Sequence, residues 1–241
     1  MRYLDLSFAT PEENLACDEV LLEAVESGRR DEVLRFWESP VPFVVVGVAQ
    51  ALRDEVYEDA CRRDRIPMMR RCSGGGCVLQ GPGCLNFVLV LAYEKHPEIH
   101  TLRGSYGFIL GRIAGAFRSR GIALEHEGVA DLAVRGRKVS GNAQRRKRNA
   151  MLHHGTLLYG MGHEGMGQYL REPSARPDYR GERSHESFVE RLDAAPETLR
   201  DIVRDAFGVV GPADVLDTGE LEAVRGLAQE KYASFEWTYR R

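Results

Sequence analysis

The stretch RRCSGGGCVLQGPGCLNF, residues 70–87, decides the fold that we expect. Three adjacent glycines, Gly74–Gly76, interrupt strand-forming residues, and glycine lets a backbone approach a ligand with no Cβ in the way. The N–H groups of such a loop can bind an anion, and Arg70 and Arg71 add donors for a phosphate or a carboxylate. A β-bulge and hairpin with charged flanks would give the same pattern. The loop is not a Walker loop, because the spacing and the trailing lysine and hydroxyl residue are absent.

A second stretch, GVADLAVRGRKVSGNAQ at residues 128–144, places a lysine at the start of an expected strand. Lys138 follows a tight Gly-Arg turn, so the sheet fixes its direction and its ammonium can point into a site. A lysine considered alone more often faces solvent. The residues on either side of Lys138 favour the interpretation that its ammonium points into a binding site.

The pattern along the chain predicts an α+β fold with a mixed, largely antiparallel sheet flanked by helices. Thr10-Pro11-Glu12-Glu13 combines a capping residue with an early proline, which predicts a helix to about Ser27. We expect the first two strands to pair through the turn at residues 39–42. Strands are expected over residues 33–37, 43–48, 68–71, 77–79, 85–92, 122–124, 131–134, 138–143 and 151–159, and helices over 55–64 and 105–120 and from near Ser184, Pro196 and Glu220.

The bulk composition is typical of one soluble globular enzyme. Of the 241 residues, 43% are hydrophobic and 29% are charged, so we expect a single catalytic domain over residues 1–241, with a helical C-terminal part at about 184–241. The net charge of -3 gives no bulk reason to expect nucleic-acid binding.

The cysteines and the apolar runs indicate the compartment. The five cysteines are an odd number and three of them, Cys72, Cys77 and Cys84, crowd into one segment, which predicts a reducing environment. The apolar runs are far below the ~20 residues that span a bilayer. We therefore expect a cytoplasmic protein with no membrane partner. The cysteine trio also lacks the spacing of a zinc site.

Five separated motifs together resemble the catalytic domain of the lipoate–protein ligase A family, part of the wider biotin and lipoate ligase group. They occur in order within roughly residues 30–190. The motifs are RRCSGGG at 70–76, GCLN at 83–86, Asp131-Leu132, GRKVSGNAQ at 136–144 and HGTLL at 154–158.

The resemblance implies an ATP-dependent ligase that converts lipoate to lipoyl-AMP and transfers the lipoyl group to a lysine of an apo-lipoyl carrier domain. The 2-oxoacid dehydrogenase E2 domain and the glycine cleavage H protein are such carriers. Lys138 would contact the carboxylate and the phosphate, and Asp131 would lie near the nucleotide phosphates as the candidate Mg²⁺ ligand. The other substrate- and nucleotide-binding residues implied are Arg71, Ser73, Gly74, Gly75, Gly76, Cys77, Val78, Leu79, Asn86, Ser140, Gly141, His154 and Thr156.

The position of cysteine separates the ligase from its alternatives. Related octanoyltransferases hold the acyl group as a thioester on a cysteine, which in the branch most similar to ligases precedes the Gly-Arg-Lys strand. Residues 103–137 contain no cysteine, which favours the ligase. An octanoyl or lipoyl transferase stays the alternative if Cys72, Cys77 or Cys84 is the nucleophile. A scaffold that binds carrier domains without chemistry is the second alternative.

Two departures from the family pattern affect the substrate and the partners. Gln80 stands where many members have histidine, which bears on acyl-pocket selectivity. The sequence also ends at Arg241 without the C-terminal accessory domain of longer ligases, so we expect either a separate accessory subunit or adenylation without one.

Three weaker patterns have simpler explanations. The basic run Arg145–Arg148 is interpreted as a solvated hairpin tip, with docking of an acidic carrier domain as the second choice. His153 and His154 are adjacent, so on a strand they face opposite ways and share no metal site. GMGHEG at residues 160–165 matches a dinucleotide pattern but has no surrounding βαβ unit.

Overall fold

The computed structural model describes residues 1–160, 165–173 and 176–240. Two sheets carry the strands. The seven-stranded sheet has the order β1-β2-β6-β10-β9-β8-β7, and the three-stranded sheet has the order β4-β3-β5. The strands are β1 Arg2–Asp5, β2 Val33–Trp37, β3 Phe43–Val46, β4 Met68–Arg70, β5 Val78–Gln80, β6 Cys84–Ala92, β7 Leu124–Glu127, β8 Asp131–Val134, β9 Arg137–Arg146 and β10 Ala150–Leu158.

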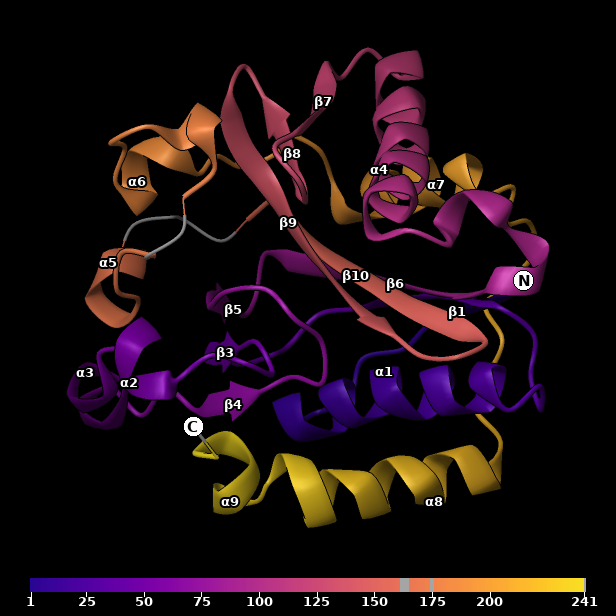
Figure 1. Ribbon diagram of the computed structural model, residues 1–241, viewed down its shortest axis with the longest axis horizontal. Helices are drawn as coiled ribbons and strands as arrows, with labels where there is room; N and C mark the ends of the chain where they lie inside the picture. The colour runs from indigo at the N-terminus through magenta and orange to yellow at the C-terminus, as the bar shows by residue number, and fades with distance from the viewer. Residues whose placement is uncertain (161–164, 174–175, 241) are drawn as a thin grey trace.

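Helices cover both faces of the large sheet (Figure 1). They are α1 Pro11–Glu26, α2 Leu52–Glu55, α3 Glu58–Arg63, α4 Leu102–Ser119, α5 Met166–Tyr169, α6 His185–Phe188, α7 Pro196–Ala206, α8 Thr218–Leu227 and α9 Phe235–Thr238. Shorter turns are η1 Tyr93–Lys95, η2 Pro97–Ile99, η3 Asp178–Arg180 and the π-helical η4 Ala228–Tyr232. Among the described residues, no helix is both long enough and apolar enough to cross a bilayer.

The long strands β6 and β10 form the centre of the core. Their side chains alternate between two apolar clusters, because successive strand residues face opposite sides. Leu89 and Leu91 pack with α4 and α7 in one cluster, whereas Val88 and Val90 pack with α1 and α8 in the other. The sheet is antiparallel except where β1 runs parallel to β2, which confirms the expected mixed architecture.

The first expected strand pairing is wrong. β2 pairs with β1 and β6 in the large sheet, whereas β3 pairs with β4 and β5 in the small one. Pro40 and Pro42 lie between β2 and β3, and proline has no N–H for a ladder hydrogen bond. The segment therefore crosses from one sheet to the other instead of closing a hairpin.

Two other element boundaries also differ from expectation. The helix expected over residues 55–64 is divided into α2 and α3, because Val56 is extended and forms an isolated bridge with Leu170. β7 begins at Leu124, where the strand expected over residues 122–124 ends. The helix α1 does begin where expected: Thr10 is its N-cap, and the Thr10 side chain accepts the Glu13 N–H.

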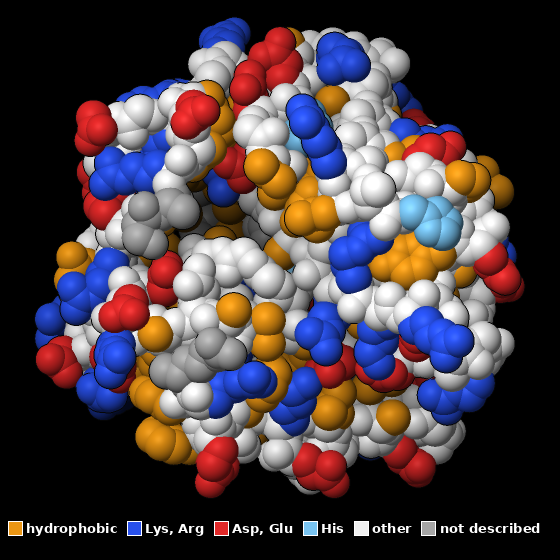
Figure 2. All heavy atoms as spheres, in the orientation of Figure 1, with side chains coloured by type: hydrophobic (Ala, Val, Ile, Leu, Met, Phe, Trp, Pro, Cys, Tyr) orange, Lys and Arg blue, Asp and Glu red, His pale blue; other side chains and the backbone are white. Residues whose placement is uncertain are grey.

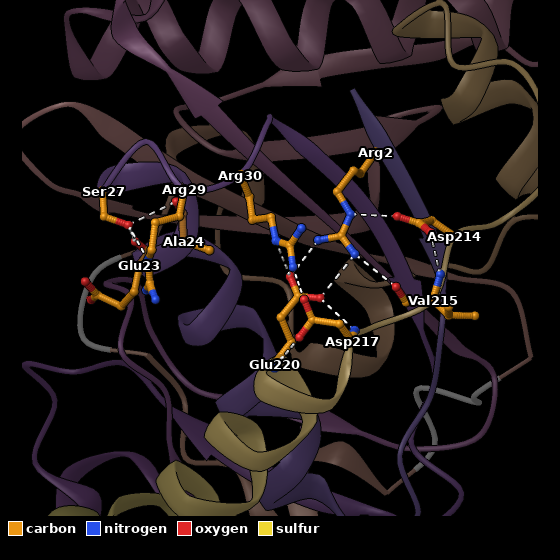
Figure 3. A network of polar contacts seen from close by, with 10 residues as sticks. All are labelled: Arg2, Glu23, Ala24, Ser27, Arg29, Arg30, Asp214, Val215, Asp217 and Glu220. Atoms are coloured by element: carbon orange, nitrogen blue, oxygen red, sulfur yellow. Dashed lines mark hydrogen bonds and ion pairs between the residues drawn. The ribbon is translucent and has the colours of Figure 1, made fainter.

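A polar network ties the N-terminal strand to the C-terminal helices (Figure 3). Arg2 of β1 and Arg30 both ion-pair with Glu220, which is buried at the start of α8. Asp217 and Glu220 also form a reciprocal capping box at that helix start. The network fixes α8 beside α1, and α1 supplies part of the site described next.

Candidate active site

A single row of paired residues across the large sheet forms the floor of the main cavity. Trp37 pairs with Asn86, Asn86 with Thr156, Thr156 with Gly141, and Gly141 with Asp131. All five line a cavity of about 490 Å³. Because neighbouring strands lie about 4.8 Å apart, four spacings give a floor about 19 Å long. That length suits an elongated ligand. Figure 2 shows the surface hollowed beside the segment that carries α6.

The glycine loop closes one side of this floor. Gly47 allows the close approach, since a Cβ there would lie 2.0 Å from the carbonyl oxygen of Gly75. Arg71 holds the loop from within: its Nη2 donates to the carbonyl oxygens of Gly74 at 2.7 Å and Gly76 at 2.8 Å. Gly75 has a φ of 83°, a conformation that glycine adopts without strain. The loop is therefore shaped by backbone geometry and one buried guanidinium.

Lys138 and Asp131 meet over the middle of the β8–β9 pair. The Lys138 Nζ lies 2.7 Å from Asp131 Oδ1, and the Tyr179 hydroxyl donates to Asp131 Oδ2 at 2.9 Å. Gly141 leaves room for the amine, because a Cβ there would lie 2.9 Å from the lysine Nζ. The pairing register shifts between Leu132 and Ala133, so Lys138 and Gly141 line the same cavity although three positions separate them.

Burial and the Asp131 carboxylate raise the pKa of the Tyr179 phenol. The phenol therefore stays protonated and remains a hydrogen-bond donor to Asp131 in neutral solution. With the lysine ammonium on the other oxygen, the carboxylate is held from two sides. Lys138 is consequently fixed in direction, which a solvent-facing lysine is not.

The segment after β10 closes the cavity, and the sequence patterns missed it. Val189 forms an isolated bridge with Lys138, and the Glu190 N–H donates to the Lys138 carbonyl at 2.8 Å. No local pattern in this segment indicated a site, because its residues meet the sheet only through the fold. Lining residues that were not predicted include Leu15, Trp37, Glu55, Arg171, Arg176, Arg180, His185 and Phe188.

Most of the predicted site residues lie together. Twelve of them line the cavity: Lys138, Arg71, Gly75, Gly76, Cys77, Val78, Leu79, Asn86, Asp131, Gly141, His154 and Thr156. Ser73, Gly74 and Ser140 do not line it. Ser73 and Ser140 are fully buried, and Ser73 lies behind the loop with its Oγ 2.6 Å from His154 Nε2.

Arg70 does not serve the expected role of a phosphate donor at the loop. Its guanidinium is fully buried and donates to backbone carbonyls, among them Gly47 at 2.9 Å and Thr238 at 2.8 Å. A side chain alternates with its neighbour along a strand, so adjacent arginines at the end of β4 point apart. Of these two adjacent arginines, Arg71 alone lines the cavity.

The two adjacent histidines do face opposite ways. His154 lines the cavity, whereas His153 is fully buried against Phe87 and Tyr106. Burial lowers the pKa of His153 to about 3, so it is neutral at physiological pH. Among the described residues there is no group of three or more metal-ligating side chains.

The GMGHEG pattern mostly falls at residues 161–164, outside the described residues. The basic run Arg145–Arg148 lies at the turn between β9 and β10. Within it, Arg146 donates to the carbonyls of Ile99 and His100, each at 2.8 Å, and Lys147 ion-pairs with Glu23 of α1. Figure 2 shows Lys and Arg side chains gathered where this turn meets α1.

Burial raises the pKa of all five cysteine thiols. Burial raises the pKa of Cys17, Cys72 and Cys84 to about 12 and that of Cys61 to about 11. Cys77 is the only one of the five that lines the cavity, and burial raises its pKa as well. The thiolate is the reactive form, so each raised pKa disfavours attack.

The cavity suits an anionic ligand. Of the residues that the structure describes, four arginines and one lysine line it, against the two carboxylates of Glu55 and Asp131. Mg²⁺ is usually held by one or two carboxylates together with substrate phosphates. Asp131 offers one such carboxylate, with lone pairs beyond those used by Lys138 and Tyr179. The residues therefore fit a metal that arrives on a nucleotide.

The family model described as the lipoyl protein ligase A/B catalytic domain matches residues 10–207. The chain belongs to this family. Its lipoyl protein ligase A/B relatives include the octanoyltransferase LipM of Bacillus subtilis, 27% identical over 274 residues and covering all of this chain and 98% of that protein. The probable lipoate-protein ligase A of Mycoplasma pneumoniae is 27% identical over 234 residues, covering 94% of this chain and 67% of that protein.

Solved lipoate-protein ligases share the fold. One is from Thermoplasma acidophilum, described as a bi-partite lipoate protein ligase and its E2 lipoyl domain. It has a TM-score of 0.85 and 22% identity, covering 99% of this chain and 95% of that chain. A lipoate-protein ligase A bound with ATP has a TM-score of 0.84 and 21% identity, covering 99% and 98%. The protein is thus an enzyme of the lipoyl and octanoyl transfer family.

Proposed function

We propose that the protein is an ATP-dependent ligase that activates lipoate as acyl-AMP and passes the acyl group to a lysine of a lipoyl carrier domain. The observation that carries the proposal is the pairing of a directed ammonium, Lys138, with a cation-rich cavity; burial also raises the pKa of the thiol that lines it. A thioester route needs a reactive thiolate, whereas an adenylate route needs cations around phosphate. This cavity offers the second.

The first half-reaction concentrates negative charge. A carboxylate oxygen of the acid attacks the α-phosphorus of ATP, the bond to the bridging oxygen of the β-phosphate breaks, and pyrophosphate leaves. The Lys138 ammonium lies where it can stabilise that charge, and the loop shaped by Arg71 offers backbone N–H groups. Bound Mg²⁺ would neutralise charge on the leaving pyrophosphate, with Asp131 as its protein ligand.

The second half-reaction forms an amide. The neutral amine of the carrier lysine attacks the acyl carbonyl, the bond to phosphate breaks, AMP leaves with the electron pair, and the amine loses a proton. Until then the mixed anhydride must be kept from water. The segment that carries Phe188 and Val189 lines the cavity above the sheet and supports this role. We further propose a cytoplasmic reaction with an E2-type or H-protein-type carrier, and a separate accessory subunit as one way to complete it.

An octanoyltransferase is the second candidate, and it has specific support. The octanoyltransferase LipM of Bacillus subtilis and three further octanoyltransferases are 26–28% identical to this chain, and each match covers the whole chain. In that case Cys77 is the candidate nucleophile, because it is the one cysteine on the cavity wall. The Cys77 thiolate would attack the carrier thioester and release the carrier thiol; the neutral acceptor amine would then attack the Cys77 thioester, lose a proton and release the Cys77 thiol.

One assay separates the candidates. An apo-lipoyl domain is incubated with the protein and either lipoate, ATP and Mg²⁺, or octanoyl-acyl carrier protein without ATP, and the acceptor is weighed by mass spectrometry. We expect acylation in the first mixture only. Acylation in the second mixture alone would establish the transferase instead. If both mixtures leave the acceptor unchanged and no acyl-AMP forms from lipoate and ATP, a non-catalytic scaffold is favoured.

Cys77→Ser gives the matched test of the thiol. Serine keeps the size of the side chain, so the cavity is retained while the thioester route is lost. We expect the ATP-dependent rate to stay within about threefold of the wild type. A loss of activity in Cys77→Ser that exceeds 100-fold would contradict the ligase mechanism. Cys61→Ser, which alters a thiol away from the cavity wall, is the control for nonspecific damage.

A further inference from the structure

A chain of buried polar groups runs from α1 to the glycine loop, and the proposed reaction has not used it. Asp18 of α1 and Arg35 of β2 form a buried ion pair, with side-chain exposures of 3% and 0%. The guanidinium also donates to the Leu6 carbonyl and to Asn14. Arg35 is therefore hydrogen-bonded both to α1 and to the segment that precedes it. Only one Asp18 oxygen takes part in this pair.

The second oxygen of Asp18 faces His154. Asp18 Oδ2 has no hydrogen-bond partner in the described part of the chain, and His154 Nδ1 lies 3.7 Å from it. A buried carboxylate oxygen without a partner is costly, so a nearby N–H group is strongly favoured.

The other side of His154 meets the glycine loop. His154 Nε2 lies 2.6 Å from Ser73 Oγ, and Arg71 Nε donates to the same Oγ at 3.0 Å. Arginine is a donor only, so the Ser73 oxygen accepts from Arg71. Among the described residues the Ser73 hydroxyl hydrogen has no acceptor other than His154 Nε2, so it is donated to that nitrogen. Nε2 is then the acceptor, and the proton of the neutral imidazole is on Nδ1, facing Asp18. Burial lowers the pKa of His154, which favours the neutral ring.

We propose that Asp18 is a positioning residue for the glycine loop: it holds His154 in the Nδ1–H tautomer, and His154 in turn orients Ser73 and Arg71 beneath Gly74–Gly76. The inference rests on the proposed function for its link to nucleotide binding. The same three residue types occur in serine hydrolases. Ser73, however, is fully buried and off the cavity wall. The three side chains therefore orient a loop, and Ser73 does not attack an acyl group.

The tautomer is measured directly on the full chain. Protein with ¹⁵N-labelled histidine is examined by long-range ¹H–¹⁵N NMR, and the signal of His154 among the seven histidines is assigned by its loss in His154→Gln. We expect a protonated Nδ1 and an unprotonated Nε2 in the wild type. A protonated Nε2 in the wild type would overturn the inference, whether or not any variant folds. The measurement needs no ATP, so it stands apart from the ligase assignment.

Asp18→Asn tests the direction of the hydrogen bonds that run from Asp18 through His154 to Ser73. Arg35 requires an acceptor, so the new amide turns its oxygen to Arg35 and its NH₂ group to His154, which moves the ring proton to Nε2. We expect this reversal together with about tenfold weaker ATP binding by calorimetry. Glu23→Gln removes one charge from the same helix but touches Lys147 instead, so both readouts should match the wild type. An unreversed tautomer in folded Asp18→Asn contradicts the inference.

Ser73→Ala supplies an independent test of the connection. It removes the hydrogen bond between His154 and Ser73 and leaves Asp18 facing His154. ATP binding should therefore weaken about tenfold while His154 Nδ1 stays protonated. In the double variant the two losses should not add, because residues acting through one network are non-additive. Additive losses would mean that Asp18 acts on ATP binding by another route. If the wild type binds no ATP at all, the proposed function fails. The measured His154 tautomer still shows whether Asp18, His154 and Ser73 are connected as inferred.

Discussion

Lys138 illustrates how one residue depends on its immediate neighbours. Asp131 fixes its direction, Gly141 leaves room for its amine, and its backbone carbonyl accepts a hydrogen bond from the Glu190 N–H. These contacts come from β8, β9 and the segment after α6. The lysine was identifiable from its motif, whereas the groups that orient it became visible only in the folded chain.

Lys138→Ala should lower the rate of acyl-AMP formation at least about 100-fold, because a preorganised charge that stabilises the transition state contributes on that order. Pyrophosphate release from lipoate and ATP is the measurement. Lys147→Ala is the matched control, since Lys147 pairs with Glu23 at the β9–β10 turn. Equal rates in Lys138→Ala and the wild type would refute the role assigned to this amine.

At the scale of the element, the short helix α9 supports the strand that precedes the glycine loop. Arg70 of β4 donates to the carbonyls of Trp237 and Thr238, and Trp237 Nε1 donates back to the Arg70 carbonyl at 2.8 Å. Lys231 lies 4.1 Å from the centroid of the Trp237 ring. A segment far along the chain thus holds the strand that leads into the glycine loop.

Trp237→Ala should destabilise the protein by about 2–4 kcal/mol, because a large packed side chain and a hydrogen bond are lost together. Trp237→Phe should cost only about 1 kcal/mol, since the ring is largely kept and one hydrogen bond is lost. Urea unfolding measures both. Phe235→Ala on the same helix is the control: that side chain is 70% exposed, so its change should stay near about 0.5 kcal/mol.

For the whole molecule, the buried histidine at the sheet centre links stability to pH. The Gln144 amide NH₂ donates to His153 Nδ1, His153 Nε2–H donates to Asn142 Oδ1, and the ring packs on Phe87 with no exposed surface. Its folded pKa of about 3 lies below the ordinary value of 6.5. The unfolded chain therefore binds the extra proton first as the solution is acidified.

The free energy of unfolding should fall as pH drops from about 6.5 toward 3, by up to about 1.4 kcal/mol per pH unit from this residue. The contribution is fully present above pH 6.5 and is lost at lower pH. Urea unfolding at several pH values should show a shallower slope in His153→Gln, even if that variant is less stable throughout. His100→Gln, at an exposed position, should keep the wild-type slope. An identical slope in all three proteins would contradict this prediction.

The sequence by itself determined the local features. The Thr10 cap, the strand periodicity, the glycine loop and the lysine strand are short-range patterns, and most predicted site residues do line one cavity. A cytoplasmic location and a single-domain organisation stay predictions. Only the tertiary structure decided that β2 and β3 lie in different sheets, that Arg70 points to the C-terminal segment, and that Tyr179 and Trp37 join the site. Those facts depend on which distant segments pack together, and packing is selected by the free energy of the whole chain, which no local pattern contains.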